Sequence, residues 1–91
     1  MATALLPLAE GFEEIEAITV IDVLRRGGVS VTTAALSQRL VKGAHGIAIE
    51  ADTLLDTALQ KDFDLIVLPG GLPGAQHGHL ADIESVHGFS N

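Results

Sequence analysis

The stretch DLIVLPGGLPG, at positions 64 to 74, decides the fold class of this chain. Four apolar residues run without interruption into a Pro-Gly-Gly turn. A continuous rather than alternating apolar run is typical of a strand covered by helices on both faces of a parallel sheet. In such sheets, ligands bind just beyond the carboxyl ends of the strands. The adjacent Gly70 and Gly71 leave backbone N–H groups bare enough to approach an anion or a developing oxyanion, so the turn predicts the edge of a site.

The residues that precede this stretch supply partners for the buried strand. Residues 2–8 and 29–35 are apolar or β-branched and predict two strands. Residues 13–26, between them, predict a helix with glutamates at its start and arginines at its end, ended by the pair Gly27–Gly28. A strand–helix–strand unit of this kind predicts a parallel sheet with a right-handed crossover.

The segment between the second strand and the opening stretch is less regular. Residues 40–51 alternate loosely around two glycines, which predicts a short hairpin or an excursion at the sheet edge. Asp52 is expected to cap a short helix over residues 53–60, and residues 63–68 are expected to form the third main strand. After position 74 the periodicity decays.

Composition bounds the class of protein. A chain of 91 residues, 47% of them hydrophobic, predicts one small domain with a buried core. The net charge of −7, with only five Lys and Arg, argues against a surface that binds nucleic acid or an anionic membrane. The chain has no cysteine, which excludes disulfides, thiolate metal sites and a cysteine nucleophile within it. His77 and His79 lack a third ligand at a recognisable spacing, so no metal site is expected. Apolar runs far shorter than ~20 residues lead us to expect a cytoplasmic protein without a membrane span.

The apolar residues of the predicted helix cover more than one stripe of its surface. One side should pack on the sheet, and the other could pack on a partner subunit or on a further part of the same domain. We therefore expect a possible homodimer through the helix face that contains Ile15, Ile18, Asp22 and Arg26. Asp22 and Arg26 are spaced i, i+4, and we expect them to form an ion pair at the surface or interface rather than a catalytic pair.

Glu16 lies near the end of the helix that faces the strand termini. A partly buried carboxyl group there could share a proton with a nucleophile. The alternative is a solvated glutamate that the helix dipole favours in the first turn. Pattern alone leaves both interpretations open.

Several motifs together resemble the ThiJ/PfpI superfamily, and in particular its YajL/DJ-one-like branch. They are PLAEGFEEIEA at 7–17, DVLRRGG at 22–28, KGAHGI at 42–47 and the segment 64–75. The resemblance divides the chain into residues 1–76, the amino-terminal part of a ThiJ/PfpI-like domain, and residues 77–91, an atypical tail. It implies an α/β fold of the flavodoxin-like, doubly wound type, with a mostly parallel sheet that is incomplete here, in the class I glutamine amidotransferase-like group.

The resemblance also implies a function. Family members act on reactive carbonyls as glyoxalases or protein deglycases, or as redox-sensitive chaperones, without a cofactor, and usually as homodimers through the first helix. Their site combines a cysteine on a strand-to-helix elbow, a glutamate on the first helix and backbone donors of the Pro-Gly-Gly turn. Carried over, Glu16 is the glutamate, and Gly70 and Gly71 are the donors. His45 falls where relatives place a polar or basic residue near the site or the interface.

The nucleophilic cysteine of the family would fall beyond Asn91. The chain is therefore expected to be inactive alone and to take a small reactive carbonyl substrate only when the missing half is supplied. The alternative is a non-catalytic dimerisation or interaction module. A nucleotide-binding unit is disfavoured, because the glycines at 70, 71 and 74 do not form a Gly-x-Gly-x-x-Gly fingerprint after the first strand.

Overall fold

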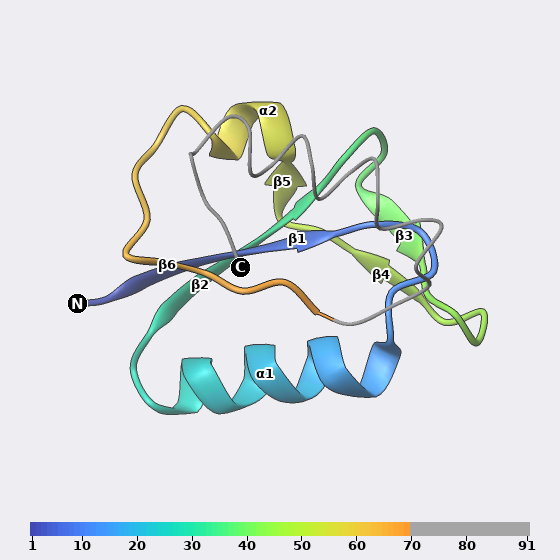
Figure 1. The fold of residues 1–91 in the computed structure, drawn as a ribbon, viewed down its shortest axis with the longest axis horizontal. Coiled ribbons are helices and arrows are strands. Elements are labelled where there is room, and N and C mark those ends of the chain that lie inside the picture. Colours follow the sequence, from blue (N-terminus) through green and yellow to red (C-terminus); the bar gives the residue numbers. More distant parts are fainter. Residues whose placement is uncertain (70–91) are drawn as a thin grey trace.

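The computed structural model describes residues 1–69. The main sheet is parallel and has the strand order β5-β2-β1-β6. Its strands are β1 (Thr3–Leu8), β2 (Ser30–Ala35), β5 (Thr53–Leu54) and β6 (Leu65–Ile66). A small antiparallel sheet pairs β3 (Leu40–Lys42) with β4 (Ala48–Glu50). Of the two alternatives expected for residues 40–51, the structure therefore has the hairpin. Helices α1 (Glu14–Arg26) and α2 (Leu55–Ala58) lie on opposite faces of the main sheet (Figure 1).

The topology of the main sheet reverses at β1. This strand pairs with β2 along its whole length, from Thr3 opposite Ser30 to Leu8 opposite Ala35, and with the later strand β6 on its other side. The order β2-β1-β6 is the 2-1-3 core of a flavodoxin-like sheet, so the predicted fold class is confirmed. The switch point, where such sheets bind ligands, lies between the carboxyl ends of β1 and β6.

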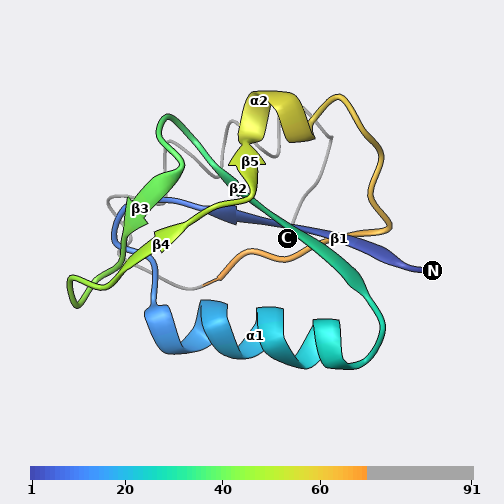
Figure 2. The same ribbon diagram turned by 180° about the vertical axis from the view of Figure 1, so that it is seen from behind.

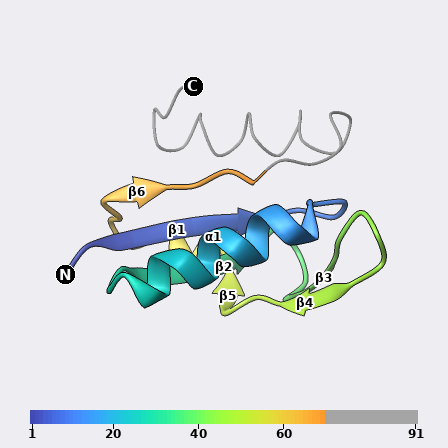
Figure 3. The same cartoon turned by 90° about the horizontal axis from the view of Figure 1, so that it is seen from below.

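The two faces of the sheet carry separate cores because successive side chains of a strand point to opposite faces. Ala4, Leu6 and Leu8 of β1 are buried in a cluster with Ala17 of α1. Leu5, between them, is buried in a second cluster on the α2 side, where its partners include Ala34, Leu55 and Ala58. The view from the α1 side shows α1 lying over β1 and β2, with β6 to one side (Figure 3). Within residues 1–69, no helix has the length and apolar character needed to cross a membrane.

Helix α1 follows its sequence signals closely. It begins after an extended Glu13 and ends at Gly27, and Gly28 adopts a φ of +90°, a left-handed conformation that glycine reaches without steric cost. The predicted ion pair is present, with Nε of Arg26 2.9 Å from Oδ2 of Asp22.

The short helix expected over residues 53–60 is present, but its predicted start and its predicted cap by Asp52 were wrong. Thr53 and Leu54 form β5, which pairs with the end of β2, and the helix is limited to Leu55–Ala58 without a side-chain cap. Asp52 instead joins the strands: its Oδ2 accepts a hydrogen bond from the backbone N–H of Thr33 at 3.0 Å, and its own N–H donates to Oγ1 of Thr33 at 2.9 Å. Pairing with an available strand edge therefore outweighs the local helical pattern.

The strand predicted over residues 63–68 is shorter and less covered than expected. Only Leu65 and Ile66 form β6, although the N–H of Val67 still donates to the carbonyl of Leu5 at 2.9 Å. Leu65 is 48% exposed, because β6 is the edge strand of the part of the sheet that the structure describes. The expectation of a strand buried on both faces is thus not met within residues 1–69.

Candidate functional site

The most deeply buried carboxylate in the described residues belongs to Glu14, the first residue of α1. Only 5% of the residue is exposed. Its Oε2 accepts hydrogen bonds from the backbone N–H groups of His45 at 2.7 Å and Ile47 at 3.3 Å, and its Oε1 lies 2.8 Å from Nδ1 of His45. Glu14 therefore ties the start of α1 to the loop between β3 and β4, which lies at that end of the helix (Figure 2).

The loop between β3 and β4 is shaped to receive this carboxylate. Gly43 is buried, and a Cβ added there would lie 2.5 Å from the carboxyl carbon of Glu14. The N–H of Gly43 donates to the carbonyl of Ile47 at 2.9 Å, and the N–H of Ala44 donates to the carbonyl of Phe12 at 2.8 Å. The loop backbone thus closes around the glutamate without leaving room for a side chain at position 43.

The hydrogen bonds control the charge state of the pair. Burial would raise the pKa of Glu14, but hydrogen bonds from the His45 ring and from backbone N–H groups, including those of His45 and Ile47, outweigh it and lower this pKa from 4.5 to about 2. The hydrogen bond to Glu14, followed by the charges of Glu14 and Glu13, raises the pKa of His45 above 6.5. Glu14 is therefore an anion at any physiological pH, and His45 is the group that titrates.

Glu16, the carboxylate expected at the site, has an exposed side chain on a different side of α1. It lines a hollow of about 340 Å³ between α1 and the segment that follows β6. The lining residues are Ile15, Glu16, Thr19, Val20, Val67, Leu68 and Pro69. Gly70 and Gly71, the other two expected site residues, lie outside the described residues, as do His77, His79 and the tail 77–91. The structure therefore brings Glu16 to the residues that directly precede Gly70 in the sequence.

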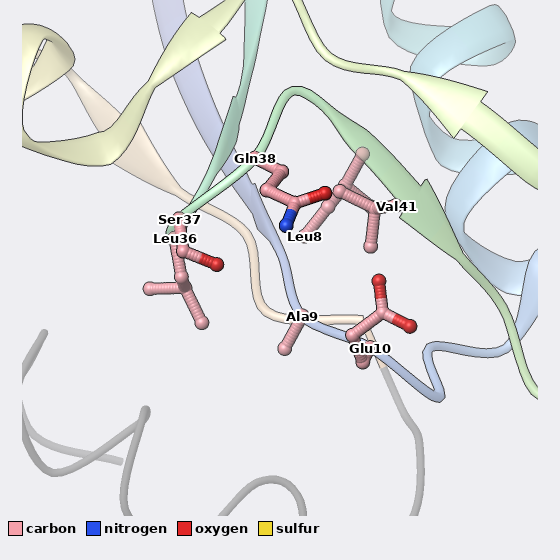
Figure 4. Close-up of a pocket in the computed structure, with 7 residues that line it drawn as sticks. All are labelled: Leu8, Ala9, Glu10, Leu36, Ser37, Gln38 and Val41. Atoms are coloured by element: carbon pink, nitrogen blue, oxygen red, sulfur yellow. The ribbon is translucent and has the colours of Figure 1, made fainter.

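A second hollow, of about 310 Å³, lies at the carboxyl ends of β1 and β2 (Figure 4). Its lining residues are Leu8, Ala9, Glu10, Leu36, Ser37, Gln38 and Val41. Its one charged side chain, Glu10, already accepts a hydrogen bond from the backbone N–H of Lys42 at 3.0 Å. Sequence reasoning did not single out these residues.

One group of potential metal ligands occurs among residues 1–69. Glu13, Glu14 and His45 place ligand atoms within 4.8 Å of one another. Both carboxylate oxygens of Glu14 are directed at N–H groups or at the imidazole, and the start of a helix carries partial positive charge, which favours an anion over a cation. The arrangement is explained by the Glu14–His45 contact itself.

Sequence reasoning missed the role of Glu14, although a signal was present. Positions 14, 17, 21 and 24 share one face of an ideal helix, and Ala17, Ile21 and Leu24 all belong to or pack on the main core. A glutamate at the start of such a stripe is directed toward the sheet rather than toward solvent. The helix dipole favours every first-turn glutamate alike, so it does not distinguish the buried Glu14 from Glu13.

The sequence pattern that defines the DJ-1/PfpI family matches residues 2–87. The chain belongs to the DJ-1/PfpI family. Protein DJ-1 homolog A of Arabidopsis thaliana is 52% identical over 75 residues, which cover 81% of this chain and 19% of that protein. The glutathione-independent glyoxalase DJR-1.2 of Caenorhabditis elegans is 48% identical over 73 residues, which cover 80% of this chain and 38% of that protein.

Solved structures of the DJ-1/PfpI family agree with the fold. The crystal structure of Drosophila melanogaster DJ-1beta has a TM-score of 0.78 and 39% identity, covering 96% of this chain and 51% of the other. Oxidised DJ-1 of Toxoplasma gondii has a TM-score of 0.79 and 30% identity, covering 97% of this chain and 52% of the other. The chain thus spans between about a fifth and about a half of the length of these relatives, and it corresponds to the amino-terminal half of the family domain.

Proposed function

We propose that this chain supplies the acid–base part of a site for small reactive carbonyl compounds in a DJ-1/PfpI domain. The observation that carries the proposal is the hollow in which Glu16 of α1 lies across from Val67, Leu68 and Pro69. Those three residues lead into Gly70 and Gly71. The hollow adjoins the switch point between β1 and β6, where ligands bind in sheets of this order.

The chemistry suits a carbonyl substrate. A nucleophile that adds to a carbonyl carbon places negative charge on the oxygen, and backbone N–H groups directed at that oxygen are worth about 3 kcal/mol each. Gly70 and Gly71 are the proposed donors. A carboxyl group within reach can pass a proton to or from the adduct, which typically accelerates such a step by ~10²–10⁴. Glu16 has this proposed role.

The proposed nucleophile is a cysteine, as the family resemblance implies, and it has to come from outside these 91 residues because the chain contains none. We therefore propose that the chain alone does not turn over a carbonyl substrate. The similarity to the C. elegans glyoxalase supports the substrate class, since that relative is 48% identical across the shared segment.

A chimera tests this proposal. Residues 2–76 of this chain replace the matching segment of glyoxalase DJR-1.2, and consumption of methylglyoxal is measured. The chimera should be active, and Glu16→Gln should reduce kcat/KM by ~10²–10⁴. Glu50→Gln, which alters an exposed carboxylate on β4, is the matched control and should remain within a few-fold of the unmodified chimera. A fully active Glu16→Gln chimera, or turnover by the 91-residue chain alone, contradicts the proposal.

A second candidate function is a non-catalytic pairing module. On the outward side of α1, Ile15 is 81% exposed and Ile18 is 47% exposed, and Asp22 and Arg26 continue the same face of the helix. An apolar stripe of this kind, bordered by charged residues, is typical of a protein–protein contact. The proposed partner is a second copy of the chain, with the two α1 faces packed on each other.

A further inference from the structure

The carboxylate of Glu14 makes hydrogen bonds of two kinds: those from backbone N–H groups do not depend on pH, and the one with the His45 ring does. Oε2 of Glu14 is held by the backbone N–H groups of His45 and Ile47, which do not titrate. Oε1 is held by Nδ1 of the His45 ring at 2.8 Å, and an imidazole gains or loses a proton near neutral pH. One side chain therefore determines whether the loop is held by an ion pair or only by hydrogen bonds.

We propose that Glu14 and His45 form a proton-controlled latch, in which protonated His45 clamps the loop Gly43–Ile47 to the first turn of α1 and loss of its proton loosens that loop. This inference is independent of the proposed carbonyl chemistry, because it involves neither Glu16 nor the glycine turn.

The exposure of the two partners determines which one switches. The side chain of Glu14 is 6% exposed and that of His45 is 71% exposed. The imidazole can therefore exchange its proton with solvent while the carboxylate stays enclosed. The buried anion acts as a fixed counter-charge, and the exposed ring acts as the sensor.

The charged groups around the loop lie in or next to α1, β3 and β4. Glu13 and Glu14 stand at the start of α1 and both favour the charged imidazole. On the segment between β1 and α1, Glu10 accepts a hydrogen bond from the backbone of Lys42 on β3. On β4, Glu50 lies 3.7 Å from Arg39 in a separate ion pair. The two residues at the helix start therefore control the titration of His45.

The direction of the pH effect follows from these contacts. His45 has its pKa raised above 6.5 by Glu14 and Glu13, so its stabilising contribution is complete below 6.5 and is lost as the pH rises through the raised value. Glu14 has its pKa lowered from 4.5 to about 2, so its contribution is complete above 4.5. The latch is therefore strongest between about pH 4.5 and 6.5 and loosens on the alkaline side.

Loosening of the loop affects two exposed apolar side chains. Ile47, which ends the loop, is 56% exposed, and Ile15, the residue after Glu14, is 81% exposed. Both flank the latch, one on each of the two elements that it joins. The proton on His45 thus controls how firmly these two apolar groups are held relative to each other.

NMR of the full chain tests the latch. The imidazole of His45 is titrated beside those of His77, His79 and His87, and hydrogen exchange of the His45 and Ile47 amides is followed from pH 5.5 to 8.5. His45 should titrate at a higher pH than in Glu14→Gln. After correction for intrinsic exchange rates, the protection of the two amides should fall by about two- to tenfold as the pH rises. This is the change in the open population that is expected when one hydrogen bond or ion pair is lost. His45→Gln, an exposed change that keeps a donor but cannot titrate, should abolish this pH dependence.

Glu13→Gln separates charge from contact. It removes one of the two anions without touching the 2.8 Å contact, so it should move the His45 titration by less than Glu14→Gln does. If the imidazole of His45 titrates at the same pH in the unmodified chain as in Glu14→Gln, the proposal is overturned. Amide protection that is independent of pH in the unmodified chain, or equally dependent on pH in His45→Gln, also overturns it.

Discussion

Gly43 and the carboxyl group of Glu14 are so close that a Cβ at position 43 would lie 2.5 Å from the carboxyl carbon. The two residues are 29 positions apart in the sequence: Glu14 begins α1, and Gly43 begins the loop between β3 and β4. A hydrogen in place of a side chain at position 43 therefore permits the burial of a charged residue elsewhere in the chain. The stability of the fold and the charge state of His45 both depend on this close contact between Gly43 and Glu14.

Gly43→Ala should destabilise the fold by about 1–3 kcal/mol, because the new methyl group must displace either the loop backbone or the Glu14 carboxylate. Urea denaturation measures the change in the free energy of unfolding. Gly27→Ala is the matched control: a Cβ there meets only carbonyl oxygens at 3.5 and 3.6 Å, and its φ of −82° suits alanine. That control should be neutral or slightly stabilising. Equal effects of the two substitutions would show that the close approach is not tight.

Asp52→Ala should cost about 1–3 kcal/mol. Its carboxylate accepts hydrogen bonds from the backbone N–H of Thr33 at 3.0 Å and from Nη2 of Arg25 at 3.1 Å, and Thr33 is only 5% exposed. Removing the acceptor leaves a partly buried donor unsatisfied at the junction of β2 and β5. Thermal or chemical denaturation checks this loss against Asp62→Ala, an exposed aspartate before β6. A loss no larger than that of Asp62→Ala would contradict the strand-joining role.

Acid should weaken the fold through Glu14. Its pKa is lowered from 4.5 to about 2, so the unfolded chain takes up the proton first as the pH falls. The free energy of unfolding should therefore decrease between about pH 4.5 and 2, and Glu14→Gln should lose this component of the slope. Denaturation midpoints at several pH values measure it. Glu50→Gln, an exposed substitution, should retain the slope; an unchanged slope in Glu14→Gln would disprove the assignment.

Ile18→Glu should prevent self-association of the chain if α1 is the contact face. A charge placed in the middle of an apolar contact costs more than the contact contributes, so the variant should sediment as a monomer where the unmodified chain sediments as a dimer. Thr57→Glu adds the same charge to the exposed side of α2, on the opposite face of the sheet, and should leave the oligomeric state unchanged. A folded monomer of the unmodified chain at micromolar concentrations would remove the pairing proposal.

Much of the fold could be predicted because the signals are local. The apolar run of β1, the β-branched run of β2 and the charge gradient of α1 each act within one element, and each element forms within one residue of its expected ends. The resemblance of ordered motifs supplied the family. Glu16 lines a hollow with residues 67–69, and the expected site of Glu16, Gly70 and Gly71 stays a prediction.

The amino-acid sequence by itself determined the parallel α/β class, the helix between the first two strands and the family, since hydrophobic periodicity, helix-terminal residues and contiguous motifs are properties of neighbouring residues. The tertiary structure decided which glutamate is buried and whether residues 53 and 54 form a strand or a helix. Both depend on groups brought together across the chain: a glycine loop that encloses Glu14, and the free edge of β2 that receives β5. Side-chain burial and strand pairing are energies of long-range contacts, and no local pattern contains them.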